Sequence, residues 1–169
     1  MCRFLILIIA TLCVCAALGN VSLAAEEETY IIEEYSFEWL VEKAGEVEMK
    51  VEKTHESTTI TLREKFHFLR MTPENAVKVG EALKTTDTFY AKMRGSKEEM
   101  RENVKAGEYI VSFSQDPKYG FSVNIRPAER FGISAISLER RTAVQLANQL
   151  TKAQSMAAYV DRVIDAKLK

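Results

Sequence analysis

The sequence predicts an α+β fold of two repeated units, each an antiparallel β-sheet followed by a helix, with the helices packed on one sheet face around a single core. Two observations lead to this prediction. Short segments with alternating apolar and polar residues form two groups, and each group precedes a segment with apolar residues at helical spacing. The two helical segments also superpose on each other with an offset of 67 residues, which predicts an internal duplication.

The first 24 residues are expected to form a signal peptide and no part of the fold. Arg3 supplies a positive charge, residues 4–18 form an apolar run, and small residues lead to an expected cleavage between Ala24 and Ala25. The run is shorter than the ~20 residues of a spanning helix, so retention as a membrane anchor is the weaker alternative. We therefore expect an exported protein, periplasmic or extracellular, with no stable membrane anchor after cleavage.

The chain from Ala25 onward is expected to be one domain, because about 145 residues can bury a core without disulfides. All three cysteines lie in the first 24 residues. Charge is distributed unevenly: residues 25–100 carry 11 Lys+Arg against 17 Asp+Glu, whereas residues 101–169 carry 11 against 7. The small overall charge disfavours bulk attraction to nucleic acid, but it leaves room for a basic patch in the second half.

The first repeat is expected to span about residues 35–95. Half-buried strands are predicted where apolar and polar residues alternate, in residues 47–53, 58–63 and 66–71. Residues 35–44 fit a strand or a helix, and we favour the strand. A helix is then expected to start at Thr72 as N-cap and Pro73 as first residue, and to end at Arg94–Gly95.

A short polar helix over residues 96–106 is expected to join the two repeats, with Ser96 and Glu99 as a capping box and Gly107 as its end. The second repeat is expected to span about residues 108–169. Its strands are predicted at residues 109–115, 121–126 and 131–138, followed by one long amphipathic helix to the C-terminus.

Small residues occupy matched positions in the two long helices. Gly80 superposes on Ala147 at the offset of 67. Glycine inside a helix costs about 1 kcal/mol relative to alanine, so a small residue kept in both helices indicates close approach, which we expect to be of helix to sheet. The alternative is that Gly80 is merely tolerated.

The residue types needed for common catalytic and metal sites are scarce after Ala25. That part of the chain has two histidines, His55 and His67, and no cysteine, so no metal or other cofactor is expected. It has no G-x-S-x-G elbow and no phosphate-binding glycine loop. Carboxylates are plentiful but no pair is marked out for acid–base work, so we expect a protein that is not an enzyme, with an envelope hydrolase as an alternative.

A polar sheet face carries the candidate binding residues. If the apolar faces of both sheets contact helices, the opposite faces display threonine, serine, asparagine and arginine. Such a surface can bind an anion, a single strand of nucleic acid or another protein, although an ordinary solvated face is the simpler interpretation. The candidate ligand-binding residues are Arg63, Asn124, Arg126, Arg130, Arg140 and Arg141.

One segment resembles the Whirly and transcriptional-coactivator families of single-strand DNA binders. It comprises Ile125-Arg126, then Gly132-Ile133-Ser134 and Ser137-Leu138, and a helix follows. The resemblance covers less than a third of the chain. It implies β-rich units that are each closed by a helix, with the sheet face used for nucleic acid. The expected export, the slightly acidic chain and the lack of a basic-aromatic run depart from that pattern, so the resemblance bears on architecture more than on activity.

These observations together predict an exported, non-enzymatic binding or assembly module. Its partner is expected to be a protein or an anionic ligand, and a homodimer is possible because paired repeats can also pair between chains. The main alternative is a binder of single-stranded nucleic acid or another polyanion that uses the polar sheet face.

Overall fold

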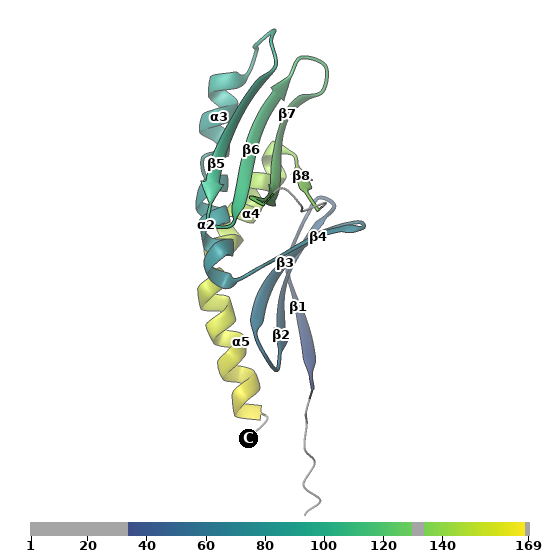
Figure 1. The fold of residues 1–169 in the computed structure, drawn as a ribbon, viewed down its shortest axis with the longest axis vertical. Coiled ribbons are helices and arrows are strands. Elements are labelled where there is room, and N and C mark those ends of the chain that lie inside the picture. The colour runs from purple at the N-terminus through teal and green to yellow at the C-terminus, as the bar shows by residue number, and fades with distance from the viewer. Residues whose placement is uncertain (1–33, 130–133, 168–169) are drawn as a thin grey trace, which may run out of the picture. The chain divides into compact units, whose positions relative to one another are not determined.

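The computed structural model describes residues 34–129 and 134–167, which form two four-stranded antiparallel sheets with helices packed against them (Figure 1). This confirms the predicted α+β class and the two similar sheet–helix units. The expected signal peptide lies outside the described residues. Among the helices that are described, none combines the length and the apolar character needed to cross a membrane.

The first sheet, sheet A, has its strands in chain order. They are β1 (Ser36–Ala44), β2 (Val47–Thr54), β3 (Thr58–Glu64) and β4 (His67–Met71). The favoured strand for residues 35–44 is therefore confirmed. The pairing of β1 with β2 shifts register between Leu40 and Glu42, which marks a bulge in this edge strand.

Two helices follow sheet A in place of the single helix that was predicted. α2 (Pro73–Leu83) begins as expected, because the Thr72 side chain accepts the Asn75 backbone N–H at 3.2 Å. It stops before α3 (Thr86–Met93). The hydroxyls of Thr85 and Thr86 donate to the carbonyls of Ala82 and Leu83, and such local bonds compete with a continuous helical ladder.

The predicted helix over residues 96–106 is wrong, because most of this segment is the strand β5 (Met100–Ala106). The second repeat therefore starts before residue 108. Ser96 accepts the N–H of Glu98 in a turn and does not cap a helix. The lysine, glutamate and methionine of the segment favour a helix, but pairing with β6 along the whole length of β5 overrides that preference.

The second sheet, sheet B, also has its strands in chain order. It contains β5, β6 (Tyr109–Asp116), β7 (Gly120–Pro127) and β8 (Ile136–Leu138). β8 is shorter than the strand predicted for residues 131–138, of which residues 131–133 lie outside the described part. The predicted C-terminal helix is divided into α4 (Arg140–Leu150) and α5 (Ala153–Lys167), and the hydroxyl of Thr151 donates to the Asn148 carbonyl at the break.

The two units correspond closely along the chain. α4 begins and ends 67 residues after α2, and α5 begins 67 residues after α3. In the strands, the cross-strand row Val51–Ile60–Met71 corresponds to the row Phe113–Val123–Leu138. The turns before β2 and β6 both hold a glycine with positive φ, Gly45 and Gly107. Each glycine lies against the first turn of a helix, at Thr142 and Asn75, which are again 67 residues apart.

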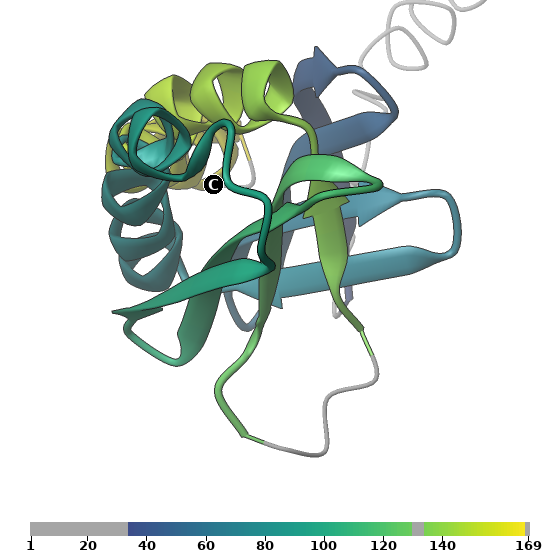
Figure 2. The same ribbon diagram turned by 90° about the horizontal axis from the view of Figure 1, so that it is seen from above.

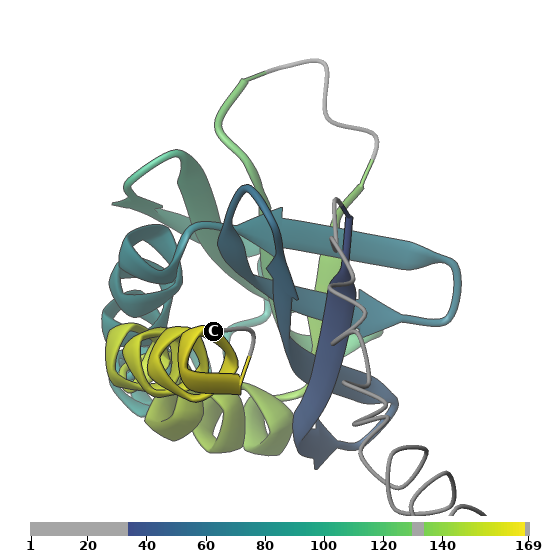
Figure 3. The same ribbon diagram turned by 90° about the horizontal axis from the view of Figure 1, so that it is seen from below.

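The second helix of each unit packs on the sheet of the other unit. α3 follows sheet A in the chain but packs on β6 and β7, whereas α5 follows sheet B but packs on β2 and β3 (Figures 1 and 3). α2 and α4 contact both sheets and each other. One cluster of buried apolar side chains joins both sheets and all four helices, so neither unit has a core of its own.

Gly80 lies at the contact between α2 and α4. A Cβ atom at Gly80 would lie 2.8 Å from the backbone N of Thr151 and 2.9 Å from Cβ of Leu150. The predicted close approach is therefore present, but the neighbour is the end of another helix and not a sheet. The matched residue Ala147 is fully buried as well.

We expect Gly80→Ala to lower the free energy of unfolding by about 1–3 kcal/mol, because its methyl group would press on backbone atoms of α4. The sign of this change distinguishes the two cases, since a glycine-to-alanine substitution within a helix without such a contact would raise the free energy of unfolding by about 1 kcal/mol. Urea unfolding followed by circular dichroism measures the change. A Gly80→Ala protein that is as stable as the parent, or more stable, would contradict the close contact.

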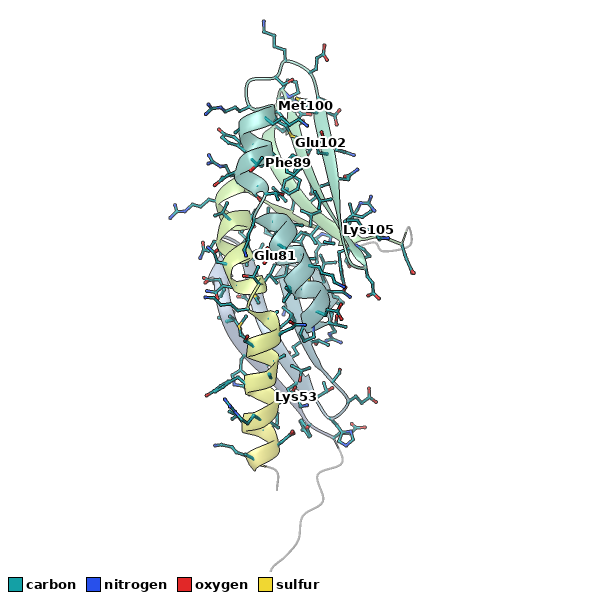
Figure 4. The ribbon with its side chains drawn as sticks, turned by 90° about the vertical axis from the view of Figure 1, so that its left-hand side faces the viewer. Lys53, Glu81, Phe89, Met100, Glu102 and Lys105 are labelled. Carbon is teal, nitrogen blue, oxygen red and sulfur yellow. The ribbon has the colours of Figure 1, made fainter. Side chains whose placement is uncertain are left out.

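An ion pair attaches α5 to sheet A. Lys53 Nζ lies 2.9 Å from Asp161 Oδ1, which also accepts a hydrogen bond from the Thr58 hydroxyl (Figure 4). Burial tends to raise the pKa of Asp161, but the hydrogen bonds from Thr58 and Lys53 more than offset it, so this pKa lies below its ordinary value of 3.8. Because the folded pKa is depressed, the stabilisation is present above the unfolded pKa and is lost as pH falls through the folded pKa.

We expect Asp161→Asn to lower the free energy of unfolding by about 0.5–1 kcal/mol at pH 7, a modest value because the carboxylate is partly exposed to solvent. The difference between the parent and the variant should shrink as the pH falls below the ordinary pKa of the carboxyl group, because Asp161 then takes up a proton. The control is Asp165→Asn, which removes a nearby charge that makes no ion pair within the described residues. An equal loss in both variants at pH 7, or a difference that does not shrink as the pH is lowered, would contradict the assignment.

Candidate functional site

The open face of sheet B, opposite the helices, is the candidate binding surface. Alternate residues of its strands are buried against the helices, among them Val111, Phe113, Val123 and Ile125. The residues between them point to the other face. They are Arg101, Asn103, Lys105, Ile110, Ser112, Ser114, Asp116, Ser122, Asn124, Arg126 and Ser137. Figure 2 shows the helices gathered on one side of the strands.

The strand register arranges these outward residues in rows. One row crosses all four strands as Asn103–Ser112–Asn124–Ser137, and the Ser112 hydroxyl donates to Asn103 Oδ1 at 2.6 Å. A second row pairs Lys105 and Arg126 on either side of Ile110. Since neighbouring strands lie ~4.8 Å apart, the backbones that carry these two cations are about 10 Å apart.

Positive charge dominates this surface, here called the sheet B face. Lys105 and Arg126 form no ion pair with any described residue, and the nearest carboxylate of Arg101 is Glu99 at 3.7 Å. Asp116 is the one outward carboxylate on β5 to β8. It lies at the end of the β6–β7 hairpin, where its Oδ1 accepts the N–H groups of Lys118 and Tyr119. The cations are therefore available to an anion from solvent.

On the corresponding face of sheet A, carboxylates of the same sheet neutralise most of the cations. Lys50 pairs with Glu38 at 3.1 Å, Arg70 with Glu52 at 2.7 Å and Lys43 with Glu48 at 3.7 Å. Glu52 is itself buried beside Arg70. The cations of sheet A are thus bound by glutamates of the same sheet and not left for an external ligand. The two open faces therefore differ in chemistry, although their strands correspond.

The structure brings together only part of the predicted site. Asn124 and Arg126 lie two residues apart on β7, on the sheet B face. Arg63 occupies the matching position to Arg126 but on sheet A, between Glu48 and Phe68. It forms no ion pair with a described residue, and its Nε donates to the Lys65 carbonyl at 3.4 Å.

Arg140 is on the helix side of sheet B, not on the open face. Its Nε donates to Asp87 Oδ1 of α3 at 2.8 Å, and its guanidinium lies 4.1 Å from the centroid of the Tyr90 ring. The hydrogen bond to Asp87 raises the pKa of this guanidinium further. Arg140 thus ties α4 to α3. Arg141 is exposed on the first turn of α4, and Arg130 lies outside the described residues.

Sequence reasoning missed Arg101, Asn103 and Lys105, which β5 contributes to the sheet B face. The sequence predicts a polar helix for this segment, and side chains of a helix do not alternate between two opposite faces as those of a strand do. The usable signal was the alternation of Met100, Glu102, Val104 and Ala106 with those three residues. Met100 and Val104 pack against the core, as a strand at the sheet edge would require.

Over residues 34–129 and 134–167, no group of three or more His, Cys, Asp or Glu side chains is placed to hold a metal ion. Comparison with protein-family models and with curated proteins gave no match. The arrangement of charge on the two sheets is therefore the information on which a functional proposal can be based.

Proposed function

We propose that this protein is an exported, non-enzymatic binding module that takes an extended anionic ligand on the sheet B face. One observation carries the proposal: Lys105 and Arg126 project from the sheet B face with no ion-pair partner among the described residues, whereas three of the four cations of the matched face, Lys43, Lys50 and Arg70, are paired. Arg101 adds a third cation, 3.7 Å from Glu99. The side-chain amides of Asn103 and Asn124 on the same face can donate hydrogen bonds to phosphate, sulfate or carboxylate oxygens.

A single strand of nucleic acid is the second candidate ligand. The resemblance to the Whirly and transcriptional-coactivator families favours it, because those families use the sheet face for nucleic acid. However, base stacking needs aromatic side chains, and the outward positions of β5 to β8 include none. We therefore favour recognition of an anionic backbone over recognition of bases. The hydrolase alternative rests only on carboxylates without a defined arrangement.

Duplication of one sheet–helix unit is our explanation for the matched elements. In that view the two units have diverged, with the open face of sheet A neutralised by ion pairs and that of sheet B left basic. Binding is then expected from one face of the molecule and not from both.

We expect saturable binding to heparin and to polyphosphate that weakens with added salt, because each bound phosphate or sulfate releases counterions. Arg126→Gln and Lys105→Gln should each weaken binding and lower the slope of log K against log salt by about one. Arg140→Gln is the matched control, since it removes one positive charge on the helix side. The binding of all three variants is measured by fluorescence anisotropy with fluorescently labelled heparin or polyphosphate.

Two results would count against the proposal. If micromolar protein shows no binding to heparin or polyphosphate at low salt, a polyanion is not the ligand. A loss in Arg140→Gln as large as in Arg126→Gln would show that net charge, and not the sheet B face, controls binding. Parallel measurement with oligo(dT) separates the two candidate ligands, because a purely electrostatic surface binds it no better than polyphosphate.

A further inference from the structure

An apolar groove runs between α5 and the inner face of sheet A. It has a volume of about 540 Å³ and is lined by Trp39, Val41 and Val51 from the sheet and by Met156, Tyr159 and Val163 from α5. This volume is in the range of ligand sites, and the lining is apolar except at one end. The groove lies on the helix side of sheet A, which α5 covers (Figure 3), whereas the sheet B face lies on the open side of the other sheet.

The matching space in the second unit is filled. There Phe89 of α3 stacks on Phe113 of β6, with ring centroids 4.4 Å apart. The residues at the corresponding positions of the first unit are Met156, which follows Phe89 by 67, and Val51, which shares its row position with Phe113. Two smaller or more flexible side chains thus stand where two stacked rings close the space.

The mouth of the groove also differs between the units. In the second unit Lys92 of α3 and Glu102 of β5 form an ion pair of 2.7 Å across the edge, near Phe89 (Figure 4). The corresponding residues of the first unit are Tyr159 and Trp39. An ion pair that closes one edge is therefore replaced by two aromatic side chains that line an open one. The groove is a specific difference of the first unit and not a general feature of the fold.

One end of the groove is positively charged. Lys152 and Ser155 line it there, and Lys152 makes no ion pair with any carboxylate of the described chain. The Lys152 carbonyl accepts the Met156 N–H at 3.0 Å, so Lys152 stands at the N-cap of α5.

The length of the groove limits what fits. From Lys152 to Val163 along α5 the rise is ~16 Å at 1.5 Å per residue. That is the length of an extended medium- to long-chain acyl group. An occupant with a negative head at one end and an apolar tail matches the polarity of the groove from one end to the other.

We propose that this groove binds one free long-chain carboxylate. The tail lies between Trp39 and the apolar face of α5, and the carboxylate pairs with Lys152 beside the first turn of the helix. Tyr159 and Trp39 flank the tail at the open edge. This site is separate from the sheet B face and does not depend on the function proposed for it.

Trp39 is the one tryptophan of the chain, so its fluorescence reports on the groove directly. The protein from Ala25 onward contains the whole described fold and is titrated with dodecanoate below its micelle concentration. We expect a saturable blue shift of the emission with one carboxylate bound per chain, confirmed by isothermal titration calorimetry. Dodecanol, which has the same tail without the charge, should bind at least about tenfold more weakly.

Variants that copy the second unit into the first test the assignment of the site. Met156→Phe introduces the residue of the matched position and should weaken dodecanoate binding by about tenfold or more, by filling the groove. Lys152→Thr introduces the matched Thr85 and should bring binding of dodecanoate down to that of dodecanol. Lys97→Thr, which removes the same charge in the turn between α3 and β5, is the control and should bind as the parent does. Circular dichroism melting shows whether each variant is folded.

Several results would overturn the proposal. The absence of a saturable shift with dodecanoate would be one such result, and binding of dodecanoate to folded Met156→Phe as tightly as to the parent would be another. Tighter association with vesicles of phosphatidylcholine than with dodecanoate would identify a membrane surface as the occupant. A concentration-dependent dimer that Met156→Phe abolishes would identify a second copy. Each of these outcomes is distinct from loss of heparin binding, which tests the other face.

Discussion

The packing of α2 against α4 is the contact on which the rest of this structure depends. These two helices touch both sheets, and Gly80 allows the end of α4 to approach α2 at backbone distance. Because of their position, α3 packs on sheet B and α5 packs on sheet A. Each sheet is therefore covered by a helix that belongs to the other half of the chain. A larger residue at this contact would separate the helices and disturb both halves of the core at once.

This exchange also allows the two sheets to differ in how their covering helices pack. Because each sheet is paired with a helix from the other unit, changes in α5 alter sheet A without altering sheet B. Met156 and Tyr159 leave a groove on sheet A where Phe89 and Lys92 close the same space on sheet B. The open faces differ as well: most cations of sheet A are paired, whereas Lys105 and Arg126 of sheet B form no ion pair with any described residue.

The sequence was sufficient to predict seven of the eight strands, the start of α2 and the match between units, since these depend on local period and on the Thr72 cap. It was insufficient where long-range contacts decide the outcome. Residues 100–106 have helical composition and become a strand because β6 is available to pair with them. The partner of Gly80 and the position of Arg140 beside Asp87 depend on helix exchange, which no local pattern records. Of the five predicted site residues that the structure describes, only Asn124 and Arg126 lie on the sheet B face.

The most direct test of the exchanged helices is to divide the chain in the turn at Gly95. Each of the two fragments, residues 25–95 and residues 96–169, contains one helix, α3 or α5, that packs on the sheet of the other fragment. We therefore predict that each fragment alone lacks a cooperative thermal transition as a monomer, and that an equimolar mixture recovers a one-to-one complex with the circular dichroism spectrum of the intact chain. A monomeric fragment of residues 25–95 that folds and melts cooperatively by itself would contradict the account.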